Sequence, residues 1–229
     1  MKKADASRVY GLELEDILSP NHINFLVHKD TLIEEHVIGI PGDVFIEQNL
    51  KLLSKEDMQR LSKEFVKFNE RCTLRLLGDM RAYNYVVIPT HDFDKVIYQI
   101  RAIDFDQQSF EGKLMVYRPQ FFKENYPMIS VVKDKLSADS IIQYKIEERS
   151  ILAKRILSAG KRLNKLMKIM NVDRVSKPEN IENLSKELYK FTKDDAFQTC
   201  TRMGEVMHAS FSFVLRNYKN MNLTNLMKS

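Results

Sequence analysis

Apolar residues recur at helical spacing in four stretches of the chain. The first stretch follows Ser54 and Asp57, which together resemble a capping box at the start of a helix. The second runs from Ala138 to Met170, with Gly160 as a point where the helix is expected to bend. A short helix over 181–191 and a last helix, capped by Asp194 or Asp195 and ending near Asn217, complete the helical prediction.

Strand-like patterns lie mainly before residue 106. Two runs rich in β-branched and aromatic residues, 85–88 and 98–103, flank a polar loop over 89–95, which predicts a β-hairpin. A third strand-like run covers 23–29, and the Pro-Gly-Asp within 38–45 predicts a turn.

This order of elements predicts an α+β fold with two parts. Residues 1–53 would form a small, strand-containing N-terminal part, and residues 54–229 a mostly helical C-terminal part. Residues 171–180, which include Pro178, are expected to connect two helices, and the polar tail 219–229 is expected to fray.

Candidate chemistry is concentrated around the predicted hairpin. Asp79 precedes Asn84 by five positions, and Asn84 precedes Asp104 by twenty, with Asp106 two positions further on. A hairpin would bring Asn84, at the start of one strand, next to Asp104, at the end of its partner. Carboxylate and amide oxygens are hard ligands that suit Mg²⁺ bound to nucleotide phosphates. A separate carboxylate can accept a proton from, or orient, an acceptor hydroxyl.

This pattern resembles the protein-kinase-like superfamily, in which Asp-x-x-x-x-Asn is followed by a hairpin and a metal-binding Asp. The Ile-Asp-Phe-Asp variant is more similar to small-molecule and sugar kinases, such as aminoglycoside phosphotransferases and the kinases of lipopolysaccharide sugars. The resemblance implies a reduced N-terminal lobe, a helical C-terminal lobe, and ATP and Mg²⁺ as cofactors. It implies Asp79 as catalytic base, and Asn84 and Asp104 as nucleotide and metal ligands. Asp106 stands in place of the family's usual glycine and is a candidate either for a further metal ligand or for a hydrogen-bond acceptor around the metal.

Lys29 ends the strand-like run 23–29, as the phosphate-pairing lysine of kinases ends its strand, so it is a candidate nucleotide-binding residue. Its partner would be Glu34, Glu35 or Glu47. The alternative interpretation is an exposed lysine at a strand end, because lysine is rarely buried.

Two further functions stay open. The chain has 7 glycines and no Gly-rich phosphate loop before Asp79, which favours a catalytically inactive pseudokinase or interaction module. The basic residues within 154–168 suggest nucleic acid as a weaker alternative. That segment lacks the interleaved aromatic residues of single-strand binders, so nucleic acid is not the favoured partner. The favoured partners are a nucleotide and an unidentified small-molecule or protein hydroxyl.

The amino-acid composition is compatible with each of these functions and does not distinguish between them. The chain has 229 residues, 44% hydrophobic and 29% charged, with a formal net charge of +5. It lacks an apolar run of spanning length and a signal-peptide core at its N-terminus, so we expect a cytoplasmic protein. Cys72 and Cys200 form no metal-binding or disulfide pattern. The aromatic-rich segment 117–127 is expected to anchor a loop to the core, although it could instead line a substrate site.

Overall fold

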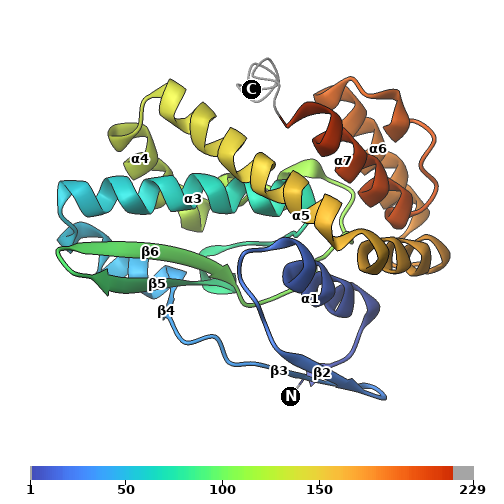
Figure 1. The fold of residues 1–229 in the computed structure, drawn as a ribbon, viewed down its shortest axis with the longest axis horizontal. Helices are drawn as coiled ribbons and strands as arrows, with labels where there is room; N and C mark the ends of the chain where they lie inside the picture. Colours follow the sequence, from blue (N-terminus) through green and yellow to red (C-terminus); the bar gives the residue numbers. More distant parts are fainter. Residues whose placement is uncertain (1, 219–229) are drawn as a thin grey trace.

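Helices dominate the described part of the chain, residues 2–218 of a computed structural model, and two small antiparallel sheets accompany them (Figure 1). The fold is therefore α+β, as predicted. The helices are α1 (Ala6–Leu18), α2 (Gly42–Gln48), α3 (Lys55–Arg75), α4 (Tyr126–Lys135), α5 (Ala138–Val172), α6 (Pro178–Thr192) and α7 (Met203–Asn217). The strands are β1 (Lys2–Lys3), β2 (Phe25–His28), β3 (Thr31–Glu34), β4 (Ile40–Pro41), β5 (Tyr85–Asp92) and β6 (Lys95–Ala102). The predicted fraying tail, 219–229, lies outside the described residues.

The β5–β6 hairpin is longer than the sequence pattern predicts. The two strands pair from Tyr85 opposite Ala102 to Asp92 opposite Lys95, so the predicted loop over 89–95 is wrong. Pro89 is tolerated within β5 because β4 pairs only with Val86 and Val87, which leaves Pro89 with one neighbouring strand.

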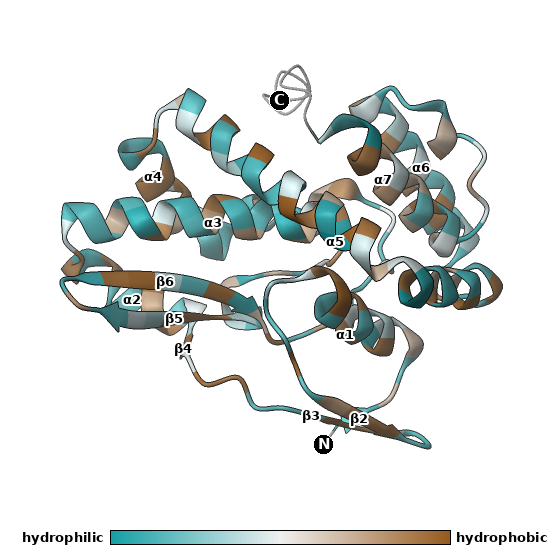
Figure 2. Cartoon of the chain, viewed as in Figure 1, coloured by the Kyte–Doolittle hydropathy of each residue, from teal (hydrophilic) through white to brown (hydrophobic). Residues whose placement is uncertain are grey.

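Helix α3 begins where the capping pattern predicts and packs alongside this hairpin, against β6 (Figure 1). The Ser54 hydroxyl accepts a hydrogen bond from the Asp57 amide at 3.0 Å and donates to the Asp57 carboxylate at 2.8 Å. Phe68 of α3 meets Tyr85 of β5 with ring centroids 5.2 Å apart. Figure 2 shows hydrophobic and hydrophilic residues alternating along α3 and α5, as expected for helices with one buried face.

Helix α5 bends at Gly160, as predicted, where φ is 22° and the helical backbone is interrupted. The helix continues to Val172 and α6 begins at Pro178, so the connection is shorter than the predicted 171–180. The predicted start of the last helix at 194–195 is also wrong. Asp194 instead caps the short 3₁₀ helix Asp195–Phe197, and α7 begins only at Met203.

Two apolar clusters form the core, and both draw on the N-terminal residues. Helix α1 contributes Leu12 to the cluster formed by α3, α4 and the sheets, and Tyr10, Leu14 and Ile17 to the cluster formed mainly by α5, α6 and α7. Glu15 of α1 forms an ion pair with Arg75 at 2.5 Å, and both side chains are at most 4% exposed. The N-terminal residues are thus tied to the helical part by packing and by a buried ion pair.

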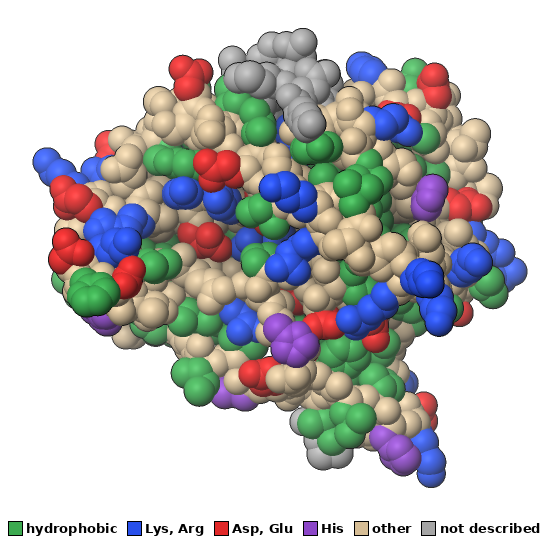
Figure 3. Space-filling view, viewed as in Figure 1, with side chains coloured by type: hydrophobic (Ala, Val, Ile, Leu, Met, Phe, Trp, Pro, Cys, Tyr) green, Lys and Arg blue, Asp and Glu red, His purple; other side chains and the backbone are tan. Residues whose placement is uncertain are grey.

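The basic segment 154–168 lies on α5 around the bend, and Figure 3 shows Lys and Arg side chains gathered over the second half of this helix. One of these cations is engaged within the fold, since Arg162 pairs with Glu13 at 2.7 Å and with Asp16 at 2.6 Å. Within residues 2–218, none of the helices combines the length and apolar composition that a membrane span requires.

Candidate functional site

The residues around Asp79 are positioned by hydrogen bonds to a distant part of the chain. Helix α3 ends at Arg75, and the capping residue Leu76, with φ of 52°, reverses the chain direction. The following backbone amides of Gly78 and Asp79 donate to the carbonyls of Gln107 at 3.1 Å and Val116 at 3.0 Å. Asp79 therefore lies on a turn that the 107–116 segment holds from the other side.

Asp79 itself adopts a left-handed backbone conformation, with φ of 56°. This region is costly for most residues but is tolerated by glycine, asparagine and aspartate. The side chain is about one-third exposed, so the carboxylate is accessible from solvent while its backbone is fixed.

Two neighbours orient the Asp79 carboxylate. The Asn84 side-chain amide donates to the Asp79 carbonyl at 2.7 Å and to its carboxylate at 3.3 Å. The Arg81 guanidinium donates to the other carboxylate oxygen at 2.9 Å and pairs with Glu124 at 3.0 Å. This hydrogen bond to Asp79 raises the pKa of Arg81. The side-chain nitrogen of Asn84 faces Asp79. The side-chain oxygen of Asn84 is therefore available to accept from, or to coordinate, another group.

The hairpin places Asn84 beside the 103–104 segment, as the sequence predicts. Tyr85 pairs with Ala102 at the end of the ladder, and the Ile103 amide donates to the Asn84 carbonyl at 3.0 Å. Asp104 follows directly, with its carboxylate accepting from the Phe105 amide at 3.0 Å.

Two cations approach the carboxylates after β6. Arg8 of α1 lies 3.4 Å from Asp104 and 3.5 Å from Asp106, so one guanidinium bridges both carboxylates. Lys2 lies 3.9 Å from Asp104 and 2.9 Å from Glu34. Burial raises the pKa of Asp106, the charge on Asp104 raises it further, and Arg8 partly offsets both. The pattern alone did not indicate Lys2 or Arg8, because their elements are joined to this site only by tertiary packing.

Lys29 is not brought to these residues. It lies exposed in the turn between β2 and β3 with φ of 52°, and none of the ion pairs among residues 2–218 involves it. Of its candidate partners, Glu34 pairs instead with Lys2, and Glu35 accepts two hydrogen bonds from Asn24. Glu47 lies exposed on α2. The strand-end position of Lys29 is as predicted, but the lysine–glutamate pair beside Asp104 is formed by Lys2 and Glu34.

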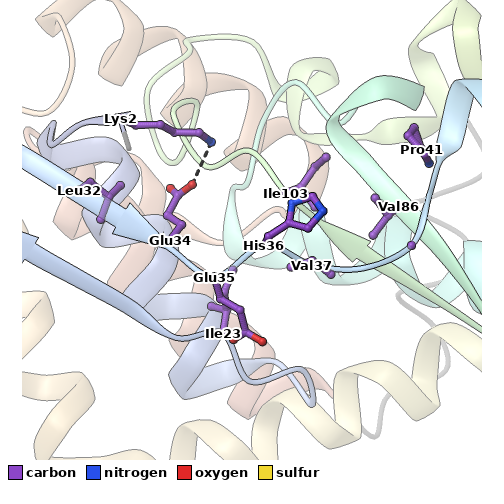
Figure 4. A pocket seen from close by; sticks show the side chains of 11 residues that line it. Lys2, Ile23, Leu32, Glu34, Glu35, His36, Val37, Pro41, Val86 and Ile103 are labelled. Carbon is purple, nitrogen blue, oxygen red and sulfur yellow. Dashed lines mark ion pairs between the residues drawn. The ribbon is translucent and has the colours of Figure 1, made fainter.

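A cavity of about 440 Å³ lies between the β2–β3 hairpin, the 35–41 segment and β5 (Figure 4). Its wall includes Lys2 and Glu34, whose side chains point toward one another, and Ile103, the residue before Asp104. The remaining wall is mostly apolar: Ile23, Leu32, Val37, Gly39, Pro41 and Val86 contribute, with Glu35 and His36. The cavity thus joins an apolar surface to the charged groups around Asp104.

The side-chain oxygens around Asp104 suit Mg²⁺ only if a bound molecule, such as a phosphate, supplies further oxygen ligands. Asp104, Asp106 and the Asn84 oxygen are hard donors, but within the described residues no cluster of three or more His, Cys, Asp or Glu side chains is arranged to hold a metal ion. Mg²⁺ is commonly held by one or two carboxylates together with phosphate oxygens, rather than in a cage made only of protein. A bound metal would have to share or displace the Arg8 contact.

Comparisons of this chain with protein-family models, with curated proteins and with solved structures give no match.

Proposed function

We propose that this protein is an atypical kinase-like phosphotransferase that binds ATP with Mg²⁺ and acts on a hydroxyl of a small molecule or protein. The observation that supports the proposal best is the geometry of the β5–β6 hairpin. Its last backbone contact joins the Asn84 carbonyl to the amide of Ile103, the residue before Asp104, and the Asn84 side-chain amide donates to Asp79. The hairpin thus supports the proposal by connecting the chain segments of the three residues to which it assigns roles in phosphoryl transfer.

The residues of the chain have distinct roles in this proposal. Asp79, oriented by Asn84 and Arg81, accepts the proton of the acceptor hydroxyl or positions that hydroxyl for attack. Asn84, Asp104 and Asp106 would hold Mg²⁺, which supplies charge neutralisation of the phosphates. Lys2, rather than Lys29, is the cation placed to neutralise phosphate beside Asp104. Positioning and electrostatic stabilisation provide the catalysis.

The test is calorimetric titration of the protein with ATP, with and without Mg²⁺, using Asp104→Ala. We expect wild-type binding to require Mg²⁺ and to weaken by about tenfold or more in the variant, because charge-assisted contacts contribute about 1.5–3 kcal/mol. Asp94→Ala is the matched control, since Asp94 is exposed in the turn at the opposite end of the same hairpin. Equal binding by wild type and Asp104→Ala would refute the ligand assignment.

A second candidate function is an interaction module that retains the fold without the chemistry. The bridge from Arg8 to Asp104 and Asp106 favours it, because one guanidinium pairs with both carboxylates and offsets part of their negative charge within the fold. In that case the same titration shows no heat with ATP, whether or not Mg²⁺ is added.

A further inference from the structure

A second cavity, of about 780 Å³, lies among α3, α4 and the first turns of α5. None of Asp79, Asn84, Asp104 or Asp106 lines it, so it is separate from the site described above. Its volume falls within the roughly 300–1,000 Å³ typical of small-molecule sites.

The walls of this cavity are apolar and partly aromatic. Phe65 of α3 is fully buried at its base, and Ile129 and Ile141 contribute from α4 and α5. Phe121 and Tyr126 also line it and are 39% and 56% exposed, which leaves aromatic surface accessible where a ligand would enter. This surface suits a ligand body that is itself apolar.

The charged groups lining the cavity are all cationic. Lys133 of α4 and Lys145 of α5 contribute to the wall, whereas no carboxylate of residues 2–218 lines it. Neutral polar groups there serve the fold, since Asn69 accepts from the Gln120 amide at 2.8 Å and donates to the Phe65 carbonyl at 2.9 Å. Charge complementarity therefore favours an anion.

The surroundings of Lys145 add to this preference. Burial lowers the pKa of Lys145, Glu70 opposes that effect, and the charges of Arg149 and Arg118 lower the pKa further. An anionic ligand group in the cavity would stabilise the charged form of Lys145.

We propose that this cavity binds a small carboxylate-bearing molecule, with its apolar body between α3, α4 and the aromatic residues and its carboxylate toward Lys145 and Lys133. The apolar body gains free energy from burial, and the carboxylate fixes its orientation through charge-assisted hydrogen bonds.

The experiment is calorimetric titration of the full chain with 2-naphthoate, with 2-naphthamide as a neutral analogue of nearly the same shape, and with decanoate. We expect naphthoate, decanoate or both to bind. If naphthoate binds, naphthamide should bind about tenfold or more weakly, because it lacks the negative charge. Binding of naphthoate alone identifies an aromatic ligand body, and binding of decanoate alone an aliphatic one.

The matched variants are Lys145→Met and Lys154→Met. Both lie on α5, but Lys154 is exposed and does not line the cavity, so only Lys145→Met should lose about tenfold in affinity. If thermal melting shows that Lys145→Met does not fold, Lys133→Met replaces it. The proposal would be overturned if neither acid bound, or if naphthoate and naphthamide bound with equal affinity. Unchanged binding in the folded lysine variant would also overturn it.

Discussion

At the residue scale, single backbone conformations decide where elements end. Leu76 and Lys193 both terminate helices in the left-handed region, with φ of 52° and 59°. Leu76 is completely buried and packs in the core, whereas Lys193 is exposed. The two positions therefore differ in how they would respond to glycine, which adopts this conformation without strain.

Lys193→Gly should stabilise the protein by about 1 kcal/mol, because it relieves the left-handed strain without removing a packed side chain. The Lys193 amide, which donates to the Tyr189 carbonyl at 2.7 Å, remains. Thermal or urea unfolding measures the change.

Lys190→Gly is the control for that substitution. Lys190 is also an exposed lysine, one turn earlier inside α6, where glycine should cost about 1 kcal/mol. Destabilisation by both substitutions would contradict the interpretation of Lys193 as a strained helix end.

At the element scale, local patterns were sufficient for some features and insufficient for others. The Ser54 cap and the Gly160 bend were predicted, because both depend on residues adjacent in sequence. The hairpin loop was predicted too long, since the polar residues near Pro89 do not show that strand pairing continues to Asp92.

For the candidate site, the same distinction holds. The approach of Asn84 to residue 103 follows from the hairpin and was predictable. The contacts of Lys2 and Arg8 with Asp104 were not, because they depend on how the N-terminal elements pack against the rest of the fold. Lys29 follows the end of a strand, and a strand end alone does not determine which way the chain turns next.

Buried ion pairs join α3 to α5 and make stability depend on pH. Glu148 of α5 is 2% exposed and meets Arg71 of α3 at 3.2 Å. Burial raises the pKa of Glu148 above its ordinary value, and Arg71 only partly offsets this. The contribution of Glu148 to stability is therefore complete below the unfolded-state pKa and is lost as pH rises through the folded-state pKa.

Glu148→Gln removes this titration. The melting temperature of the variant relative to wild type should therefore increase as pH rises from about 4, near the reference value for glutamate, toward neutrality. Melting curves of both proteins across this range provide the test. A difference that is constant or decreases with pH would contradict the raised pKa.

At the scale of the whole molecule, the segments on either side of the predicted division at residue 53 pack into the same apolar clusters. Helix α1 supplies residues to both apolar clusters, and β4 pairs with β5 across the boundary. The Glu15–Arg75 pair also crosses it. Removing one partner of such a buried pair typically costs about 3–5 kcal/mol.

Residues 54–229 produced alone should therefore lack a cooperative thermal transition, whereas the full chain should have one. Circular dichroism melting of the two proteins distinguishes them. Addition of a separate 1–53 fragment is the complementary measurement, and we expect it to restore cooperative melting. A sharp transition of 54–229 alone would instead establish that segment as an independent folding unit.

The left-handed backbone of Asp79 also limits which residues evolution could place there. Glycine, asparagine and aspartate all tolerate that conformation, so the fold alone would permit any of the three among related sequences. Asparagine would retain the shape of the side chain and lose the charge. If related sequences retain aspartate at this position in preference to asparagine or glycine, selection acts on the carboxylate itself and not only on the turn.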